Sequence, residues 1–175
     1  MNSTPHTALC PVIDATRTPD PYPRYATSRQ GPQPYLRPKG RSGAGLSLSF
    51  TLPGDLRSAR IARTAAAAAL EAHDLGPYVW PVAYAVTELV SVTARMSPGQ
   101  ELYVSLRHRD DAVRLLVWDQ HPHHGEAGLA ALCEARRRRA LWLLAAVVDE
   151  WGGEWGMCEA PQSQQGAKSW VALPR

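Results

Sequence analysis

The chain has 175 residues, of which 45% are hydrophobic and 20% charged, and its formal net charge at pH 7 is +3. This length predicts one domain with a tail, no apolar run approaches the roughly 20 residues needed to cross a bilayer, and we expect no signal peptide. Three cysteines (Cys10, Cys133 and Cys158) are odd in number and widely spaced, which fits neither a disulfide framework nor a zinc motif and favours the reducing cytoplasm.

Residues 1–45 differ in composition from the rest of the chain. They contain eight of the 15 prolines and no sustained apolar period, and their six basic and two acidic residues give a net charge of +4. This composition favours a disordered, Pro-rich basic tail over a partner-binding segment. The predicted domain, residues 46–175, is left with a net charge close to zero and therefore has no basic field to attract nucleic acid.

The predicted domain opens with one strand and two helices. Alternating apolar residues in "LSLSFTLP", residues 46–53, predict a half-buried strand. Strong helix formers in residues 56–73 predict a helix that ends before Gly76-Pro77. The helical spacing of apolar residues in "VWPVAYAVTELVSVTARM", residues 79–96, predicts a second helix.

A β-hairpin is predicted next, because "ELYVSLRHR" and "AVRLLVWDQ" flank Asp110-Asp111 and both alternate apolar with polar residues. The polar loop "QHPHHGEAG" follows, and then a single helix that runs to about Trp151. The segments "EWGMCEA" and "KSWVALP" predict the last two strands. The order β-α-α-β-β-α-β-β predicts an α/β two-layer sandwich, with one mixed or antiparallel sheet and helices packed on one face.

Four short segments occur in an order that is similar to one protein family. They are "AVTELVSV", "LLVWDQHP", "RRALWLLAAVVDEWG" and "GAKSWVALP". On these segments, residues 46–175 resemble the GHKL or histidine kinase-like (Bergerat) ATPase superfamily. Within it they resemble the bacterial anti-sigma-factor serine kinases and the short actinobacterial proteins related to them. The resemblance implies the histidine kinase-like ATPase fold.

The resemblance gives roles to two positions of the predicted second helix. Glu88 matches the family's general base. Val92 stands where the family has an asparagine that helps to hold Mg²⁺, and a valine offers no oxygen to a hard cation. The resemblance therefore implies no Mg²⁺ site here, which also puts the catalytic role of Glu88 in doubt.

At the adenine end, the resemblance matches two further residues. Asp119 corresponds to the aspartate that accepts a hydrogen bond from the adenine amino group, and Ser169 supplies a hydroxyl that supports the adenine site. His121 and His123 replace the glycines that follow the aspartate in the family's motif.

At the phosphate end, the family's glycines are missing. Arg138 and Ala140 stand at the glycine positions of a backbone cradle for phosphates. Arg139 matches the residue between them, and Leu141 matches the leucine that follows. ATP or ADP binding is therefore expected to be weak, through the retained or substituted positions Asp119, Ser169, Leu141, Arg138 and Arg139.

The histidines of the polar loop suggest another interpretation. His121, His123 and His124 carry imidazoles, which are common metal ligands. However, no matching cysteine or second histidine cluster lies nearby in the sequence, and Pro122 is typical of a plain loop. The sequence therefore predicts no metal site.

The run Arg136–Arg139 has several interpretations. A nucleic-acid patch is disfavoured, because the domain is near neutral and carries no recognised nucleic-acid motif. A solvated helix start would be electrostatically poor, because cations are unfavourable at a helix N-terminus. That cost indicates an anionic partner for the arginines, either a ligand or an acidic protein surface, with Glu134 as a partial partner.

Two functional hypotheses follow from the resemblance. The first is a cytoplasmic regulatory protein of the anti-sigma type, in transcriptional or developmental control, with little or no kinase activity. It would act by contact with a sigma factor or an anti-anti-sigma-like protein, and the family also implies a homodimer. The alternative is an active ATP-dependent serine/threonine kinase, with Glu88 as base and Asp119 on the adenine.

Overall fold

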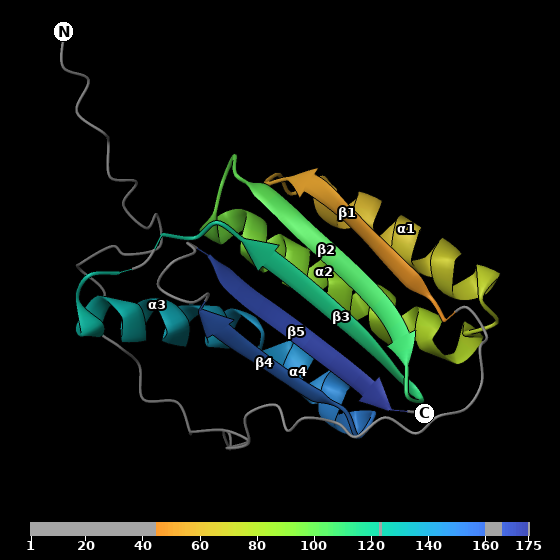
Figure 1. Ribbon diagram of the computed structural model, residues 1–175. Helices are drawn as coiled ribbons and strands as arrows, with labels where there is room; N and C mark the ends of the chain where they lie inside the picture. Colours follow the sequence, from red (N-terminus) through yellow and green to blue (C-terminus); the bar gives the residue numbers. More distant parts are fainter. Residues whose placement is uncertain (1–44, 123, 160–165, 175) are drawn as a thin grey trace, which may run out of the picture. The chain divides into compact units, whose positions relative to one another are not determined.

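The computed structural model describes residues 45–122, 124–159 and 166–174 as an α/β fold (Figure 1). In this part of the chain, five strands form one antiparallel sheet with the order β1-β2-β3-β5-β4, accompanied by four helices. The elements are β1 (Ser47–Pro53), α1 (Ser58–Ala72), a 3-10 turn η1 (Gly76–Tyr78), α2 (Val79–Met96), β2 (Glu101–Arg109), β3 (Ala112–Asp119), α3 (Ala127–Ala140), α4 (Trp142–Glu150), β4 (Glu154–Glu159) and β5 (Ala167–Pro174). The predicted α/β class is confirmed, whereas the predicted tail falls outside the described residues except for Gly45.

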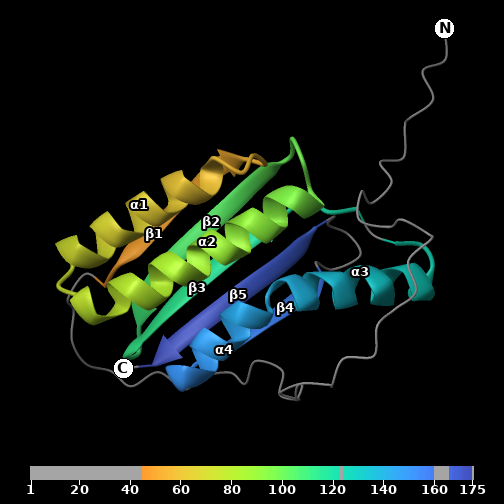
Figure 2. The same ribbon diagram turned by 180° about the vertical axis from the view of Figure 1, so that it is seen from behind.

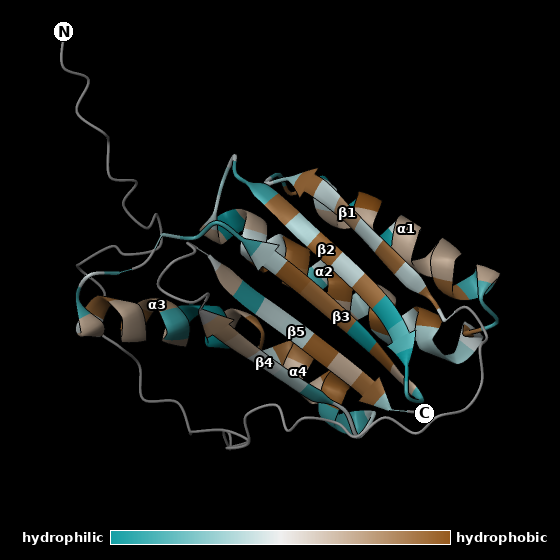
Figure 3. Ribbon diagram, in the orientation of Figure 1, coloured by the Kyte–Doolittle hydropathy of each residue, from teal (hydrophilic) through white to brown (hydrophobic). Residues whose placement is uncertain are grey.

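Helices α1, α2 and α4 cover one face of the sheet, as the two opposite views show (Figures 1 and 2). The strands alternate accordingly, and bands of hydrophobic and hydrophilic residues follow one another along β2 and β3 (Figure 3). The apolar side chains that point towards the helices form the core with the buried residues of α1, α2 and α4. No described element covers the opposite face of the sheet.

The hairpin between β2 and β3 is the one predicted around Asp110-Asp111. Arg109 pairs with Ala112 in the antiparallel register, so the two aspartates form a two-residue turn. Both have a positive φ, 54° and 55° respectively, as a type I′ turn requires, and aspartate tolerates this conformation better than most residues. This turn fixes the register of β3 and with it the side of the sheet on which Asp119 lies.

The prediction of one helix running to Trp151 is wrong, because the helix is interrupted at Leu141. Leu141 has φ −101° and ψ 16°, its N–H donates to the carbonyl of Arg138, and α4 starts at the next residue. The buried positions keep their helical spacing across the interruption, so the apolar pattern gives no sign of it; they are Cys133, Arg137, Leu141, Leu144 and Val148.

The interruption also changes the end of the helix at which the arginine run lies. Arg137, Arg138 and Arg139 lie in the last turn of α3 and do not begin a helix. Cations near a helix C-terminus are favourable, typically by about 0.3–1 kcal/mol each, because the carbonyl ends of the peptide dipoles point towards them. The expected electrostatic cost of these arginines is therefore absent.

Candidate functional site

Polar side chains gather at the carboxyl end of β3, on the side of the sheet that faces the helices. Along β3, the residues Val113, Val117 and Asp119 share this face because successive side chains of a strand alternate. The buried row thus ends in a carboxylate that is 0% exposed. A buried carboxylate is unfavourable unless it accepts hydrogen bonds or pairs with a cation, and Asp119 does both.

The carboxylate of Asp119 has three hydrogen-bond donors. Its Oδ1 accepts the backbone N–H of His121 at 3.0 Å and that of Ala167 at 3.2 Å. Its Oδ2 accepts Nη2 of Arg137 at 2.9 Å, in an ion pair whose cationic partner is itself only 4% exposed. Asp119 therefore joins β3, the start of β5 and the last turn of α3.

Two buried polar atoms beside this pair have no hydrogen-bond partner among the described residues. One is Nη1 of Arg137 and the other is Oγ of Ser169. Ser169 pairs with Val117 and Ala167 with Asp119 in the β3–β5 register, so Ser169 and Asp119 lie on the same face of adjacent strands. The two residues that the resemblance matches to an adenine site are thus neighbours in the fold.

The four arginines of the run differ in burial: Arg137 is buried, Arg136 and Arg138 are half-buried, and Arg139 is exposed. Arg138, a predicted nucleotide contact, instead pairs with Glu134 one turn earlier on α3, at 2.8 Å and 2.9 Å. Arg139, the other predicted contact, is exposed on the same turn. Arg137, which is not among the predicted site residues, is the arginine that contacts Asp119. Its spacing of four residues from both Cys133 and Leu141 is the signal that would have placed it on the buried face.

The remaining predicted positions lie on α2 and at the interruption between α3 and α4. Glu88 is half-buried on α2, whereas Val92 lies in the hydrophobic core. Leu141 is fully buried in the same core. The structure therefore brings together Asp119 and Ser169, and it turns Arg138 towards solvent and Glu134.

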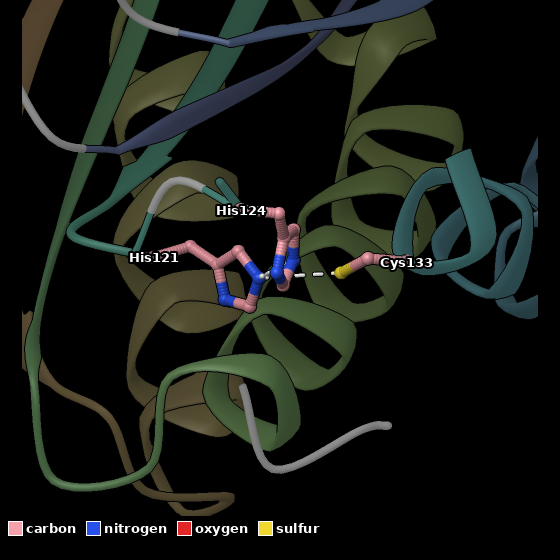
Figure 4. Close-up of side chains that lie close together, drawn as sticks. All are labelled: His121, His124 and Cys133. Carbon is pink, nitrogen blue, oxygen red and sulfur yellow. Dashed lines mark hydrogen bonds between the residues drawn. The ribbon is translucent and has the colours of Figure 1, made fainter. Parts of the chain in front are cut away.

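A second cluster adjoins the ion pair and contains His121, His124 and Cys133 (Figure 4). Nε2 of His121 lies 3.2 Å from Sγ of Cys133 and 3.4 Å from Nε2 of His124. His121 and Cys133 are buried, at 7% and 4% exposure, and His124 is half-buried. No cysteine is close to these histidines in the sequence, but α3 places Cys133 beside them. The side chain of His123 lies outside the described residues.

The other ring nitrogen of His121 determines how this cluster is arranged. Nδ1 lies 3.2 Å from the carbonyl oxygen of Met96, the last residue of α2, and a carbonyl can only accept a hydrogen bond. The proton of the neutral ring is therefore assigned to Nδ1, and the lone pair of Nε2 faces Cys133 and His124. Burial, with the positive charge of Arg137, lowers the pKa of His121 below its usual 6.5, against the opposing effect of Asp119.

The buried residues of helix α3 take part in these two clusters. Of its residues Ala127–Ala140, all of them described, the buried ones are Cys133 and Arg137, which lie one turn apart on one face. Cys133 contacts His121, and Arg137 contacts Asp119. These polar contacts join α3 to the end of β3 and to the loop after it.

A scan against protein-family models finds no match for the chain, and a search of curated proteins finds no similar sequence. The resemblance to histidine kinase-like ATPases thus rests on the short segments quoted above. Within the described residues, no helix is both long enough and apolar enough to cross a bilayer.

Proposed function

We propose that the protein is a cytoplasmic regulator of the anti-sigma type, which acts by protein contact and whose nucleotide site is closed by its own side chains. The observation that carries this proposal is the buried ion pair between Arg137 and Asp119. In the family that the chain resembles, the matching aspartate accepts a hydrogen bond from adenine. Here the same carboxylate already has three protein donors.

The ion pair makes the free energy of nucleotide binding less favourable. An adenine that took the place of Arg137 on Asp119 would leave a guanidinium without its carboxylate in a buried setting. Removing one partner of a buried pair typically costs about 3–5 kcal/mol, which corresponds to roughly 10²- to 10⁴-fold in affinity. Weak ATP or ADP binding follows, without a kinase-competent complex.

The phosphate end supports the same proposal. Val92 contributes only methyl groups to the core at the position that the resemblance matches to a Mg²⁺ ligand. Arg138 is held by Glu134 on the surface of α3. Neither side chain offers the oxygen ligand or the glycine backbone that the family uses there.

A surface for a protein partner lies on the face of the sheet that no described element covers. A shallow groove of about 600 Å³ is lined by Tyr103, Ser105, Arg107, Arg114, Leu116, Trp118 and Lys168. Aromatic residues and arginines are enriched in protein interfaces, and three cations favour a partner with an acidic patch. We propose a sigma factor or an anti-anti-sigma-like protein as this partner, and a homodimer as the assembly.

Calorimetric titration with Mg-ATP tests the proposal, together with capture of partners from the native cytosol. The wild type should show no binding at micromolar nucleotide. Charge reversal at Arg107 should reduce partner capture. Charge reversal at Arg63, an exposed residue of α1 that does not line the groove, should leave partner capture unchanged. Micromolar ATP binding that Asp119→Asn abolishes would refute a closed site.

An active serine/threonine kinase is the second candidate, favoured by one observation. Asp119 and Ser169 lie on the same face of adjacent strands, as an adenine site of the resembled family needs. In this case Glu88 would act as general base, and Glu88→Gln should abolish phosphoryl transfer to the captured partner without weakening ATP binding. Absence of binding at millimolar ATP excludes this candidate.

A further inference from the structure

We propose that His121, His124 and Cys133 form a binding site for a divalent transition-metal ion, with zinc as the best-suited ion. The three side chains come from two segments: the loop after β3 supplies both imidazoles, and α3 supplies the thiol (Figure 4). The proposal concerns a site next to the Arg137–Asp119 pair and does not depend on whether the protein binds nucleotide.

The distances between the donor atoms suit tetrahedral coordination. Zinc binds imidazole nitrogen at about 2.0–2.1 Å and thiolate sulfur at about 2.3 Å, so tetrahedral ligands lie about 3.3–3.6 Å from one another. The nitrogens of His121 and His124 are 3.4 Å apart, within this range, and the sulfur of Cys133 is 3.2 Å from the nitrogen of His121, slightly shorter than this range. All three donor atoms lie within 4.8 Å of one another. Coordination would require the donor atoms of His124 and Cys133 to lie about 3.6 Å apart, which a movement of the half-buried His124 side chain can provide.

The crowding around one nitrogen is itself an argument for a cation. Nε2 of His121 has a single in-plane lone pair, which accepts one hydrogen bond well. Yet Sγ of Cys133 and Nε2 of His124 both lie at hydrogen-bond distance from it. A metal ion between the three atoms would satisfy all of the lone pairs at once.

The carbonyl of Met96 gives His121 the outer contact that metal-binding histidines normally have. Such a histidine usually donates its second ring N–H to a carbonyl or carboxylate, which fixes the tautomer and the ring orientation. Met96 is buried at the end of α2, where its carbonyl has no partner within the helix. His121 is therefore oriented for a ligand role by a rigid part of the core.

The chemistry of the donors selects the class of ion. Two imidazoles and one thiolate are borderline-to-soft ligands, which favour zinc and its neighbours in the transition series over Mg²⁺ or Ca²⁺. Three protein ligands leave a fourth position for water, as in many zinc sites. Because Cys133 and Arg137 are the buried residues of α3, a bound ion would hold this helix, and Arg137 with it, against the end of β3.

Cobalt titration of the chelator-treated, reduced full chain tests the proposal. One equivalent of Co²⁺ should give a sulfur-to-cobalt charge-transfer band and the intense visible bands of tetrahedral coordination, and Zn²⁺ should displace it. Cys133→Ser should lose the charge-transfer band, and His124→Ala should weaken Zn²⁺ binding by more than the roughly 100-fold that loss of an outer contact costs. Cys158→Ser, an exposed thiol on β4, and His73→Ala, at the exposed end of α1, serve as matched controls that should keep both properties.

His124 is the decisive position, because its side chain is half-buried and its removal leaves the core intact. Zn²⁺ should raise the melting temperature of the wild type and of Cys158→Ser, and should leave that of His124→Ala unchanged. Three results would overturn the proposal: no binding at micromolar Zn²⁺, unchanged affinity in His124→Ala, or a charge-transfer band that survives in Cys133→Ser.

Discussion

Helices α3 and α4 follow one another along the chain but are held in different ways. Helix α4 buries Leu144 and Val148 against the sheet, so its attachment comes from apolar area removed from water. Helix α3 buries a thiol and a guanidinium, which contact His121 and Asp119. Apolar burial tolerates small movements, whereas an ion pair and a thiol–imidazole contact depend on geometry and on the state of each partner. We therefore expect α3 to open locally while α4 and the sheet stay folded.

The largest effect is expected from Arg137→Ala, because it leaves the carboxylate of Asp119 buried without its cation. Such a change typically costs about 3–5 kcal/mol of unfolding free energy. Denaturant unfolding measures the total, and amide hydrogen exchange should show the loss of protection concentrated in α3.

Arg138→Ala is the matched control, since Arg138 lies next to Arg137 but pairs with Glu134 in solvent. Exposed pairs one helical turn apart contribute about 0.3–0.5 kcal/mol. Equal effects of the two substitutions, or unchanged exchange in α3 of Arg137→Ala, would contradict the idea that this helix is held by its buried arginine.

Leu144→Ala tests whether α4 is held in place by the burial of apolar side chains. Leu144 is 0% exposed in the core, and truncating a buried leucine typically costs about 2–5 kcal/mol through lost burial and a residual cavity. The neighbouring Leu143 is 44% exposed, so Leu143→Ala should change the unfolding free energy by about 0.5 kcal/mol at most. Exchange in Leu144→Ala should rise across the sheet and α4 together; a rise confined to α4 would show that this helix is as separable as α3.

The contrast between apolar burial and specific polar contacts also explains which parts of the structure can be predicted from the sequence. The strands, the hairpin at Asp110-Asp111 and helix α2 follow from local periodicity and turn chemistry, and the structure contains them. Alternating apolar residues predict which face of a strand is buried when the side chains on that face pack only against the hydrophobic core. The structure adds that Asp119 ends a buried row, because it shares the face of Val113 and Val117.

The polar contacts of α3 could not be predicted in the same way. The Arg137–Asp119 and Cys133–His121 contacts span 18 and 12 residues, and they depend on how α3 docks. The interruption at Leu141, which decides whether the arginines begin or end a helix, leaves the spacing of buried residues unchanged. The resemblance selected Arg138 and Arg139, whereas the docked helix turns Arg137 inward.

The smallest expected effect concerns an exposed pair at the start of α1, far from both clusters in the sequence. Asp55 accepts hydrogen bonds from the backbone N–H and the guanidinium of Arg57, which lower the pKa of its carboxyl from 3.8 to about 2. A carboxyl whose pKa is lowered by folding adds stability that is fully present above its unfolded value, and that is lost as the pH falls from about 4 towards 2. Because the pair is exposed, the contribution is small and screened by salt.

Denaturant midpoints of the wild type and Asp55→Asn, measured between pH 2 and 6, check this expectation. The difference between the two proteins should be largest above pH 4 and should shrink as the pH approaches 2. A buried ion pair is much less sensitive to ionic strength, so added salt should reduce the effect of Asp55→Asn and leave that of Arg137→Ala nearly unchanged. If salt reduced both effects equally, the Arg137–Asp119 pair would be open to solvent, and the distinction between α3's buried contacts and ordinary surface pairs would not hold.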